Sequence, residues 1–297
     1  MNTFPSNALL GSRELAALLA HAKSHRSQHR RRDIRREGPL PIRRRGMGLD
    51  VEESRPYQPG DDPRHMDWRA TARSGRPMTK TFHDEKAKHV WIWLDRGPYM
   101  TFGSGAQSKA ATASRLAVFT AFSAALRQGE VNAIVVEQHS NVFTRLTGLD
   151  PVLRFVACAV APMRLPQPGY DPLRALETLN QRAPRQAALV LISDFLWLDG
   201  AMEDKISELS RQRSVVAVHI FDAAENRLPE RGRWRFQDPA GGAQITVDVT
   251  DERLRHAFDD AVARHNALVR RSWERCGATH LHLAADGHHL DTLAHYL

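Results

Sequence analysis

The stretch His89-Val-Trp-Ile-Trp-Leu-Asp95 decides the fold of this chain. It is a short apolar run that ends in an acid, and helical apolar spacing follows it over residues 109–128, up to a helix-ending Gly129. A run that is apolar on both faces is typical of a buried strand in a parallel sheet covered by helices on two sides. An α/β domain is therefore expected to begin near residue 89.

The same alternation of strand and helix continues to the end of the chain. Further strands are predicted over residues 131–137, 141–145, 187–194, 214–221 and 279–283, with an edge strand over 244–249. Helices are predicted over residues 150–161, 199–211, 251–276 and 290–296, and one begins at Asp171. This alternation predicts one doubly wound α/β domain with a mostly parallel sheet and helices on both faces.

The formal charge of +8 is concentrated near the amino terminus. Residues 1–45 hold eleven basic and three acidic side chains, so this segment alone accounts for +8 and the rest of the chain is neutral. After a short helix opened by Ser12, we expect an exposed basic arm. Its arginines are suited to phosphates or another anionic surface: Arg30, Arg31, Arg32, Arg35, Arg36, Arg43, Arg44 and Arg45.

The cysteines and the hydropathy indicate a compartment. Cys158 and Cys276 lie far apart and lack metal-ligand spacing, so they are expected to be packed thiols of a cytoplasmic protein. No apolar stretch has the roughly 20 residues that a membrane span needs, and none is long enough for a signal-peptide core. We therefore expect a soluble, cytoplasmic protein.

A dense motif lies in residues 46–88, between the arm and the α/β domain. Pro59-Gly60 suits a type II turn, and Asp62-Pro63 predicts an N-cap and a helix over residues 64–73. Its charged and aromatic residues allow two interpretations: an ion-pair network that fixes the segment, or a recognition surface. If the Trp68 ring is buried, Trp68→Ala should cost about 3 kcal/mol or more, whereas an unchanged melting temperature would make Trp68 an exposed contact residue.

The motif resembles the family known as domain of unknown function 58. The resemblance covers about residues 40–200 and includes the strand that ends in Asp95. The motif residues that carry it are Arg55, Tyr57, Pro59, Gly60, Asp61, Asp62, Arg64, Asp67, Trp68 and Arg73. It implies a von Willebrand factor A-like fold and, because members are often encoded beside MoxR-type AAA+ ATPases, a role with such an ATPase in assembling or activating other proteins. Many relatives carry N-terminal membrane helices, in whose place this chain has its basic arm.

The resemblance also implies where a metal site would lie. Such a fold usually carries a metal-ion-dependent adhesion site with the pattern Asp-x-Ser-x-Ser, a Thr and a second Asp. Asp95 and Asp194 match the acids, but Gly97 and Tyr99 stand at the serine positions, and the loop where the Thr is expected carries Tyr170. A degenerate site is therefore predicted, with the two acids capping helices and no cofactor. Tight Mg²⁺ binding that is abolished by Asp95→Ala would overturn this prediction.

No motif indicates an enzyme. Ser193-Asp194 lacks a nucleophile elbow, residues 103–105 lack the phosphate-loop spacing, and the pair His280 and His282 lacks further zinc ligands. We expect a non-enzymatic interaction module, an adaptor or co-factor of a MoxR-type ATPase with an unknown client. Its partner surface is predicted at the carboxyl edge of the sheet, near Asp95, Tyr170 and Asp194.

Nucleic-acid or anionic-surface binding through the arm is the alternative function. The predicted organisation is an Arg-rich arm over residues 1–45, a motif segment packed on the main domain over 46–88, and the von Willebrand A-like domain over 89–297.

Overall fold

The chain divides into two compact units, described separately. The computed structural model describes residues 9–35, 50–57, 66–83, 89–165, 167–242, 244–286 and 289–297. One unit comprises residues 1–26 and 89–297, and the other comprises residues 27–88. These boundaries differ from the predicted 1–45 and 46–88, and the packing of residues 46–88 on the main domain stays a prediction.

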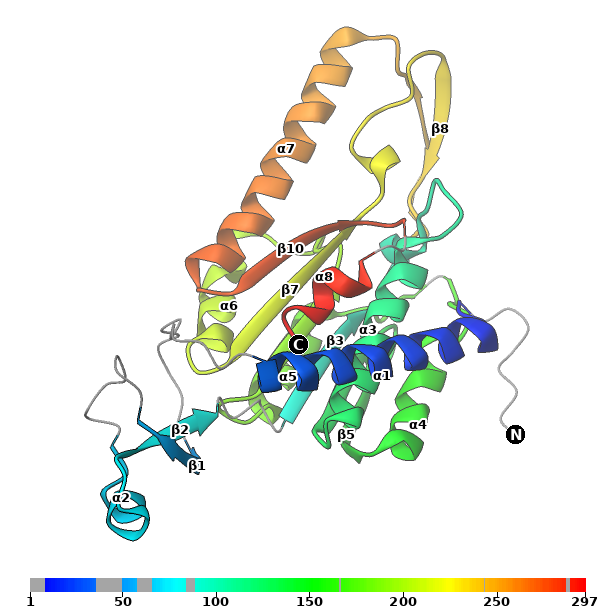
Figure 1. Cartoon of the computed structure of the whole chain (residues 1–297). Helices are drawn as coiled ribbons and strands as arrows, with labels where there is room; N and C mark the ends of the chain where they lie inside the picture. Colours follow the sequence, from blue (N-terminus) through cyan, green and yellow to red (C-terminus); the bar gives the residue numbers. More distant parts are fainter. Residues whose placement is uncertain are drawn as a thin grey trace. The chain divides into compact units, whose positions relative to one another are not determined.

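The larger unit is built on a six-stranded sheet of order β10-β7-β6-β3-β4-β5 (Figure 1). Its strands are β3 (His89–Asp95), β4 (Glu130–Val136), β5 (Asn141–Thr147), β6 (Ala188–Ser193), β7 (Ser214–Phe221) and β10 (Thr279–Ala284). Only β5 is antiparallel to its neighbour. The first strand of this sheet, β3, therefore lies beside the fourth, β6, as in doubly wound folds, and the predicted fold class is confirmed.

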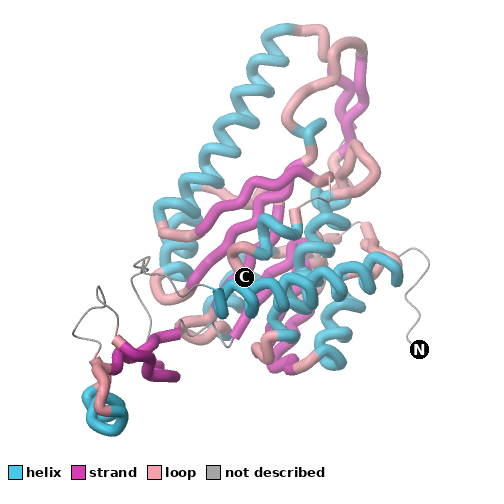
Figure 2. The backbone as a smooth tube through the Cα atoms, viewed as in Figure 1, coloured by secondary structure: helices cyan, strands magenta, loops and turns pink. Residues whose placement is uncertain are grey.

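Helices cover both faces of the sheet (Figure 2). Because side chains alternate along a strand, Ile92 and Leu94 enter one core cluster while Trp91 and Trp93 enter the other. The first cluster also holds residues of α1 (Ser12–Arg35), α3 (Lys109–Leu126), α4 (Leu149–Ala159) and α8 (Leu290–Ala294). The second holds residues of α5 (Pro172–Arg182), α6 (Glu203–Ser210) and α7 (Glu252–Arg275).

Helix α1 joins the start of the chain to the α/β core. It begins at Ser12 and continues to Arg35, well past the short helix predicted there. Leu15, Leu18 and Ala22 are buried in the first core cluster, because apolar side chains at helical spacing lie on one face. Residues 9–26 are thus part of the α/β core. Among the described residues, no helix combines the length and the apolar character needed to span a membrane.

The segment predicted as an edge strand of the main sheet belongs to a separate hairpin. Strand β9 (Gln244–Asp248) pairs with β8 (Arg233–Gln237) in a two-stranded sheet inserted between β7 and α7. The physical reason is its alternation: Ile245 and Val247 are apolar, whereas the residues between and beside them are polar. Such a strand cannot be buried on both faces.

The smaller unit contains β1 (Asp50–Pro56), α2 (Trp68–Ser74) and β2 (Met78–His83), with β1 and β2 antiparallel. Helix α2 begins four residues later than predicted. Its cap is Asp67, whose carboxylate accepts from the backbone N–H groups of the second and third helical residues, both at 3.0 Å. Met66 instead forms a β-bridge with Thr79. The predicted cap, Asp62-Pro63, lies outside the described residues.

Candidate functional site

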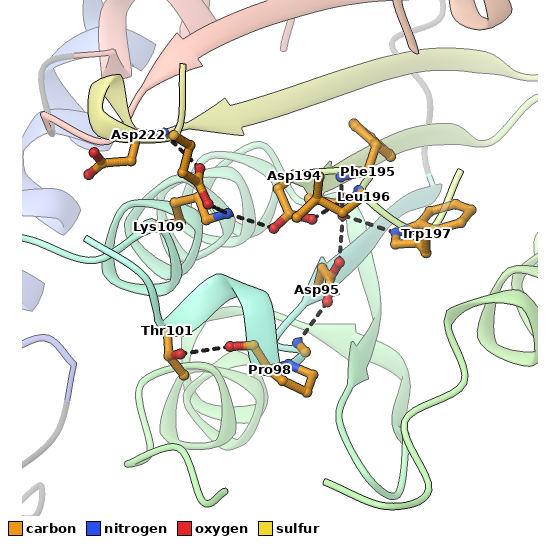
Figure 3. A network of polar contacts seen from close by, with 12 residues as sticks. Asp95, Pro98, Thr101, Lys109, Asp194, Phe195, Leu196, Trp197 and Asp222 are labelled. Carbon is orange, nitrogen blue, oxygen red and sulfur yellow. Dashed lines mark hydrogen bonds and ion pairs between the residues drawn. The ribbon is translucent and has the colours of Figure 1, made fainter. Parts of the chain in front are cut away.

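The candidate site lies where the doubly wound sheet changes direction, at the carboxyl ends of β3 and β6. Ligands of such folds bind in the crevice at this switch point. Asp95 is the last residue of β3, and Asp194 directly follows β6, so the two carboxylates predicted from the sequence do come together (Figure 3). Both are buried.

Asp95 is held by groups that carry no formal charge. The Tyr170 hydroxyl lies 2.9 and 3.0 Å from its two carboxylate oxygens. Ser193 Oγ donates to Oδ2 at 2.5 Å, and the backbone N–H of Gly97 donates to Oδ1 at 2.8 Å. Ser193 Oγ in turn accepts from the indole N–H of Trp197 at 3.1 Å. The carboxyl group is therefore fully enclosed by hydrogen-bond donors.

Asp194 is held by a buried cation. Lys109 Nζ lies 2.7 Å from Asp194 Oδ2 and 2.5 Å from Glu225 Oε1, and the Lys109 side chain is 0% exposed. Asp194 Oδ1 also accepts from the backbone N–H of Leu196 at 3.1 Å. One lysine thus joins the end of β6 to the short 3₁₀ helix η4 (Ala223–Glu225) through two carboxylates.

A second carboxylate cap lies beside this pair. Asp222 caps η4, and it also accepts from the backbone N–H and the hydroxyl of Ser104, at 2.8 and 2.5 Å. The glycine-flanked Ser104 therefore serves to fix the loop before α3. This structural role needs no phosphate ligand, and the glycine spacing of residues 103–105 is not that of a phosphate loop.

The environment shifts the pKa values of Asp95, Lys109 and Tyr170. Burial, and then the nearby charge of Asp194, raises the pKa of Asp95 from 3.8 to about 7. Burial alone would lower the pKa of Lys109, but the Asp194 and Glu225 carboxylates outweigh it and raise that pKa. Burial followed by the charge of Asp95 raises the pKa of Tyr170, which therefore stays a hydrogen-bond donor.

Gly97 and Tyr170 depart from the metal-site pattern together. A Cβ atom at residue 97 would lie within 3.0 Å of the Tyr170 ring, so the tyrosine occupies the space that a serine side chain would need. The backbone of Gly97 is extended, with φ −67°, which any residue can adopt. Glycine is thus required here for the close approach of Tyr170.

These residues do not fit a divalent cation. Mg²⁺ needs a shell of oxygen lone pairs directed at the ion, but the Asp95 oxygens already accept from Tyr170 and Ser193, and Lys109 provides the positive charge beside Asp194. Gly97 offers no hydroxyl. Within the described ranges, no three His, Cys, Asp or Glu side chains are grouped closely enough to hold a metal ion.

A small pocket with an apolar rim covers the site. Its volume is about 70 Å³, and its walls include Asp95, Tyr170 and Asp194. Small-molecule sites usually measure roughly 300 Å³ or more. At the rim, Tyr99 and Leu196 are 39% and 47% exposed. The surface over the carboxylates is therefore apolar and too shallow to enclose a metabolite.

Lys109 and Glu225 were missed by the sequence reasoning. One local signal existed for the lysine, since Lys109 is the first residue of a mostly apolar helix. A cation is unfavourable at a helix N-terminus, and a buried lysine needs an anionic partner. Nothing local identified Glu225, which lies 116 residues from Lys109.

The histidines of β10 belong to a cluster of imidazole rings that are tilted against the ring of His219. His282 lies beside His219 of β7, with ring centroids 4.6 Å apart, and His280 lies 5.7 Å from the same ring. Burial, with the neighbouring imidazoles, lowers the pKa of His219 to about 2, so that ring is neutral. These rings pack against each other in the fold.

The motif residues fall partly within the described chain. Trp68 is 71% exposed, Arg73 is exposed, and α2 has no buried residue. Tyr57 is half-buried, and its backbone N–H donates to Pro77. Arg55 lies in β1. Pro59, Gly60, Asp61, Asp62 and Arg64 lie outside the described residues.

The basic residues divide between α1 and the undescribed segment. Arg30, Arg31, Arg32 and Arg35 lie in the second half of α1. Arg36, Arg43, Arg44 and Arg45 lie outside the described residues. The first four therefore lie in the part of α1 that belongs to the smaller unit.

A protein-family model matches most of the chain. The model, described as "Protein of unknown function DUF58", covers residues 53–268. An uncharacterized protein of Mycobacterium tuberculosis, Rv1480, is 30% identical over 256 residues, which are 81% of this chain and 76% of the relative. A second relative, MAV169 of Mycobacterium avium, is 31% identical over 121 residues, 39% of this chain and 68% of its own.

Solved structures show more distant similarity. BatB from Bacteroides thetaiotaomicron has 13% sequence identity and a TM-score of 0.46, over 70% of this chain and 95% of its own. A von Willebrand factor type A protein from Catenulispora acidiphila has 12% identity and a TM-score of 0.34, over 49% of this chain and 35% of its own.

Proposed function

The chain belongs to the DUF58 family, and on that premise we propose that it is a non-enzymatic protein-interaction module whose partner surface is the carboxyl edge of the sheet. One observation carries the proposal: the charges at this edge are neutralised internally, while the side chains around it are apolar and exposed. The family resemblance suggests the partner, a MoxR-type AAA+ ATPase, for which the chain would act as adaptor or co-factor toward a client protein.

The buried groups support a role without catalysis. A catalytic acid, base or nucleophile must reach the reacting atoms, but Asp95 and Lys109 are both 0% exposed and every polar atom of the pair faces a protein partner. The pocket above them is too small for a metabolite. These observations favour a binding surface that needs no resident cofactor.

The rim supports a protein as the partner. Exposed aromatic and aliphatic side chains are the usual anchors of protein interfaces, and Tyr99 and Leu196 provide them here. Their backbone is fixed by the short 3₁₀ helix η2 (Pro98–Thr101) and by the hydrogen bond from the Leu196 backbone N–H to Asp194. A rigid surface loses little conformational entropy on binding, so a partner can dock without remodelling this edge.

Binding of the purified MoxR-type ATPase of the same organism tests the proposal. We expect Leu196→Asp to weaken binding about tenfold or more, because it places a charge in the apolar rim. Leu153→Asp is the matched control, since Leu153 is 43% exposed on α4. Biolayer interferometry with nucleotide-free ATPase in EDTA should still detect the complex. Equal losses in both variants, or no binding by the unaltered chain, would reject the proposal.

The second candidate function is binding of a nucleic acid or an anionic surface through the basic segment. The continuous helix α1 favours it, because its first half packs in the core of the larger unit and its last six residues include four arginines. Deleting residues 1–45 would also remove Leu15 and Leu18 from that core, so replacing Arg30, Arg31, Arg32 and Arg35 by Gln is the better test. Binding to a labelled oligonucleotide should weaken in this variant and show a smaller salt dependence. Unchanged salt dependence would exclude this function.

We also propose a cytoplasmic location. The two cysteines support it, since both are free thiols in the structure. Cell fractionation followed by immunoblotting tests this, and recovery in the washed membrane fraction would contradict it.

A further inference from the structure

The β8–β9 hairpin has two chemically different faces. The register pairs Trp234 with Val247 and Phe236 with Ile245, and cross-strand partners lie on the same face of a sheet. Arg233 and Arg235 alternate with the aromatic residues and therefore lie on the opposite face, where the register places Asp248 across from Arg233 and Thr246 across from Arg235. The hairpin thus has one apolar face and one face with arginines.

The apolar face is open to solvent. Every residue of β8 is exposed, and Trp234, Phe236 and Ile245 are 48%, 37% and 60% exposed. Monomeric proteins expose single apolar side chains, but a contiguous group that includes two aromatic rings marks an interaction surface. A two-stranded sheet is also marginally stable alone, so covering this face would stabilise the hairpin.

The base of the hairpin is fixed to α7. Val249 is fully buried and its backbone N–H donates to Gly232 at 3.0 Å. Arg255 of α7 donates to the carbonyl oxygen of Pro229 at 2.7 Å, and the Trp234 indole donates to Arg231 at 3.0 Å. The exposed face is therefore held in place before any partner binds.

The edge of β8 is both unpaired and basic. Since the sheet has two strands, β8 has a neighbour on one side only within the described chain. Residues 227–237 contain four arginines and one glutamate. Within the described ranges, Arg227, Arg231 and Arg235 form no ion pair. These positive charges remain available to an acidic partner.

We infer that the hairpin binds an extended acidic segment of a partner protein, which adds to the free edge of β8 as a third strand. Because side chains alternate along a strand, a segment of alternating apolar and acidic residues would place its apolar side chains beside Trp234 and Phe236. Its carboxylates would then lie beside Arg235, which has Thr246 and no acidic residue across from it in the hairpin. Backbone hydrogen bonds to the edge of β8 would supply affinity. The alternation of apolar and acidic side chains along the segment would supply specificity.

This inference goes beyond the proposed function and does not depend on it. None of the residues of β8 and β9 lines the pocket over Asp95 and Asp194, although Asp238 in the loop between them hydrogen-bonds to Tyr99 at its rim. A failure of the ATPase experiment would therefore leave the hairpin inference standing, and the reverse also holds.

Peptide binding to the full chain tests the inference. The probe is a labelled peptide of about seven residues in which Val alternates with Glu, a typical strand length, measured by fluorescence anisotropy. We expect saturable binding that weakens about tenfold or more in Trp234→Ser. Arg235→Gln should weaken binding and reduce its salt dependence. A peptide with Lys in place of Glu should not bind.

Matched controls separate the hairpin from other surfaces. Val142→Ser removes an apolar side chain that is 37% exposed on strand β5, and Arg154→Gln removes an exposed arginine on α4. Both should bind as the unaltered chain does. The same result is expected when Arg30, Arg31, Arg32 and Arg35 are replaced by Gln, which excludes non-specific attraction to the basic helix.

Backbone methylation of the peptide tests the strand geometry. Alternate amides of an added strand face the protein edge, so of two peptides N-methylated at odd or at even positions, only one should lose binding. Equal behaviour of the two peptides would overturn strand addition. A preference of the hairpin for a labelled oligothymidylate, or a dimer of this chain that Trp234→Ser dissociates in light scattering, would overturn the acidic partner.

Discussion

The carboxyl edge of the sheet and the motif segment around α2 use similar residues in opposite ways. At the edge, Asp95 and Lys109 are fully buried and their polar atoms are paired. In the motif segment, α2 has no buried residue and Trp68 is 71% exposed. Charged and aromatic side chains therefore stabilise the fold in the first region and lie at the surface in the second.

The difference shows that the sequence segment that identifies a family need not be the one that stabilises the fold. The motif is contiguous and identifies the family, whereas the buried edge is assembled from five separate segments of the chain. Large stability effects come from buried networks, and exposed positions contribute little. Between the two interpretations of the motif, the exposure of Trp68 favours a recognition surface over a stabilising ion-pair network.

The largest effect is expected for Lys109→Met. It leaves Asp194 buried without its cation, and breaking a buried ion pair in this way costs about 3–5 kcal/mol. Urea unfolding measures the free energy. Lys205→Met is the control, because Lys205 pairs with Glu177 at the surface, where a pair contributes about 1 kcal/mol or less. Similar losses of unfolding free energy in Lys109→Met and Lys205→Met would show that the buried ion pairs at the carboxyl edge do not stabilise the fold.

A smaller loss is expected for Gly97→Ala. The new Cβ would meet the Tyr170 ring, and overpacking of this kind costs about 1–3 kcal/mol. Gly105→Ala is the control, since nothing lies within 4 Å of a Cβ there. Thermal melts of both variants give the comparison. A Gly97→Ala protein as stable as the control would contradict the coupling of residues 97 and 170.

The stability of Asp95→Asn relative to the unaltered chain should depend on pH. Because the pKa of Asp95 is raised to about 7 in the folded state, the folded chain keeps a proton that the unfolded chain has released. Stability from this group is thus present below pH 4 and is lost as pH rises toward 7. Asparagine cannot ionise, so the melting temperature of Asp95→Asn should rise relative to that of the unaltered chain between pH 5 and 8. A constant difference over this range would exclude a raised pKa.

The smallest effect is expected for Trp68→Ala. At 71% exposure the ring contributes little to the core, so we expect a change within about 0.5 kcal/mol rather than the 3 kcal/mol of a buried tryptophan. Calorimetry measures this, with Trp273→Ala, a fully buried case, as the contrast. A large loss of stability in Trp68→Ala would instead favour the interpretation of the motif as a stabilising ion-pair network.

Much of the main domain was predictable because its signals are local. Strands β3 and β7 have the predicted limits, and the other sheet strands differ by one or two residues at their ends. The predicted N-cap of α2 was wrong because Asp62 and Asp67 are both suitable caps, and propensity does not decide between two Asp residues. The strand over residues 244–249 was placed in the wrong sheet because its partner in the hairpin, β8, was not predicted from the sequence.

The sequence by itself determined the doubly wound architecture, the family and the meeting of Asp95 and Asp194 at one edge. The alternation of apolar runs and helical spacing is sufficient for the architecture, and the motif over residues 55–73 is sufficient for the family. The meeting of Asp95 and Asp194 is what the resemblance to that family implied. Only the tertiary structure decided that Lys109 neutralises Asp194, that Tyr170 covers Gly97, and that residues 9–26 join the core. Lys109 and Asp194 are 85 residues apart, and Tyr170 and Asp95 are 75 apart. Packing alone brings such distant side chains within hydrogen-bond distance.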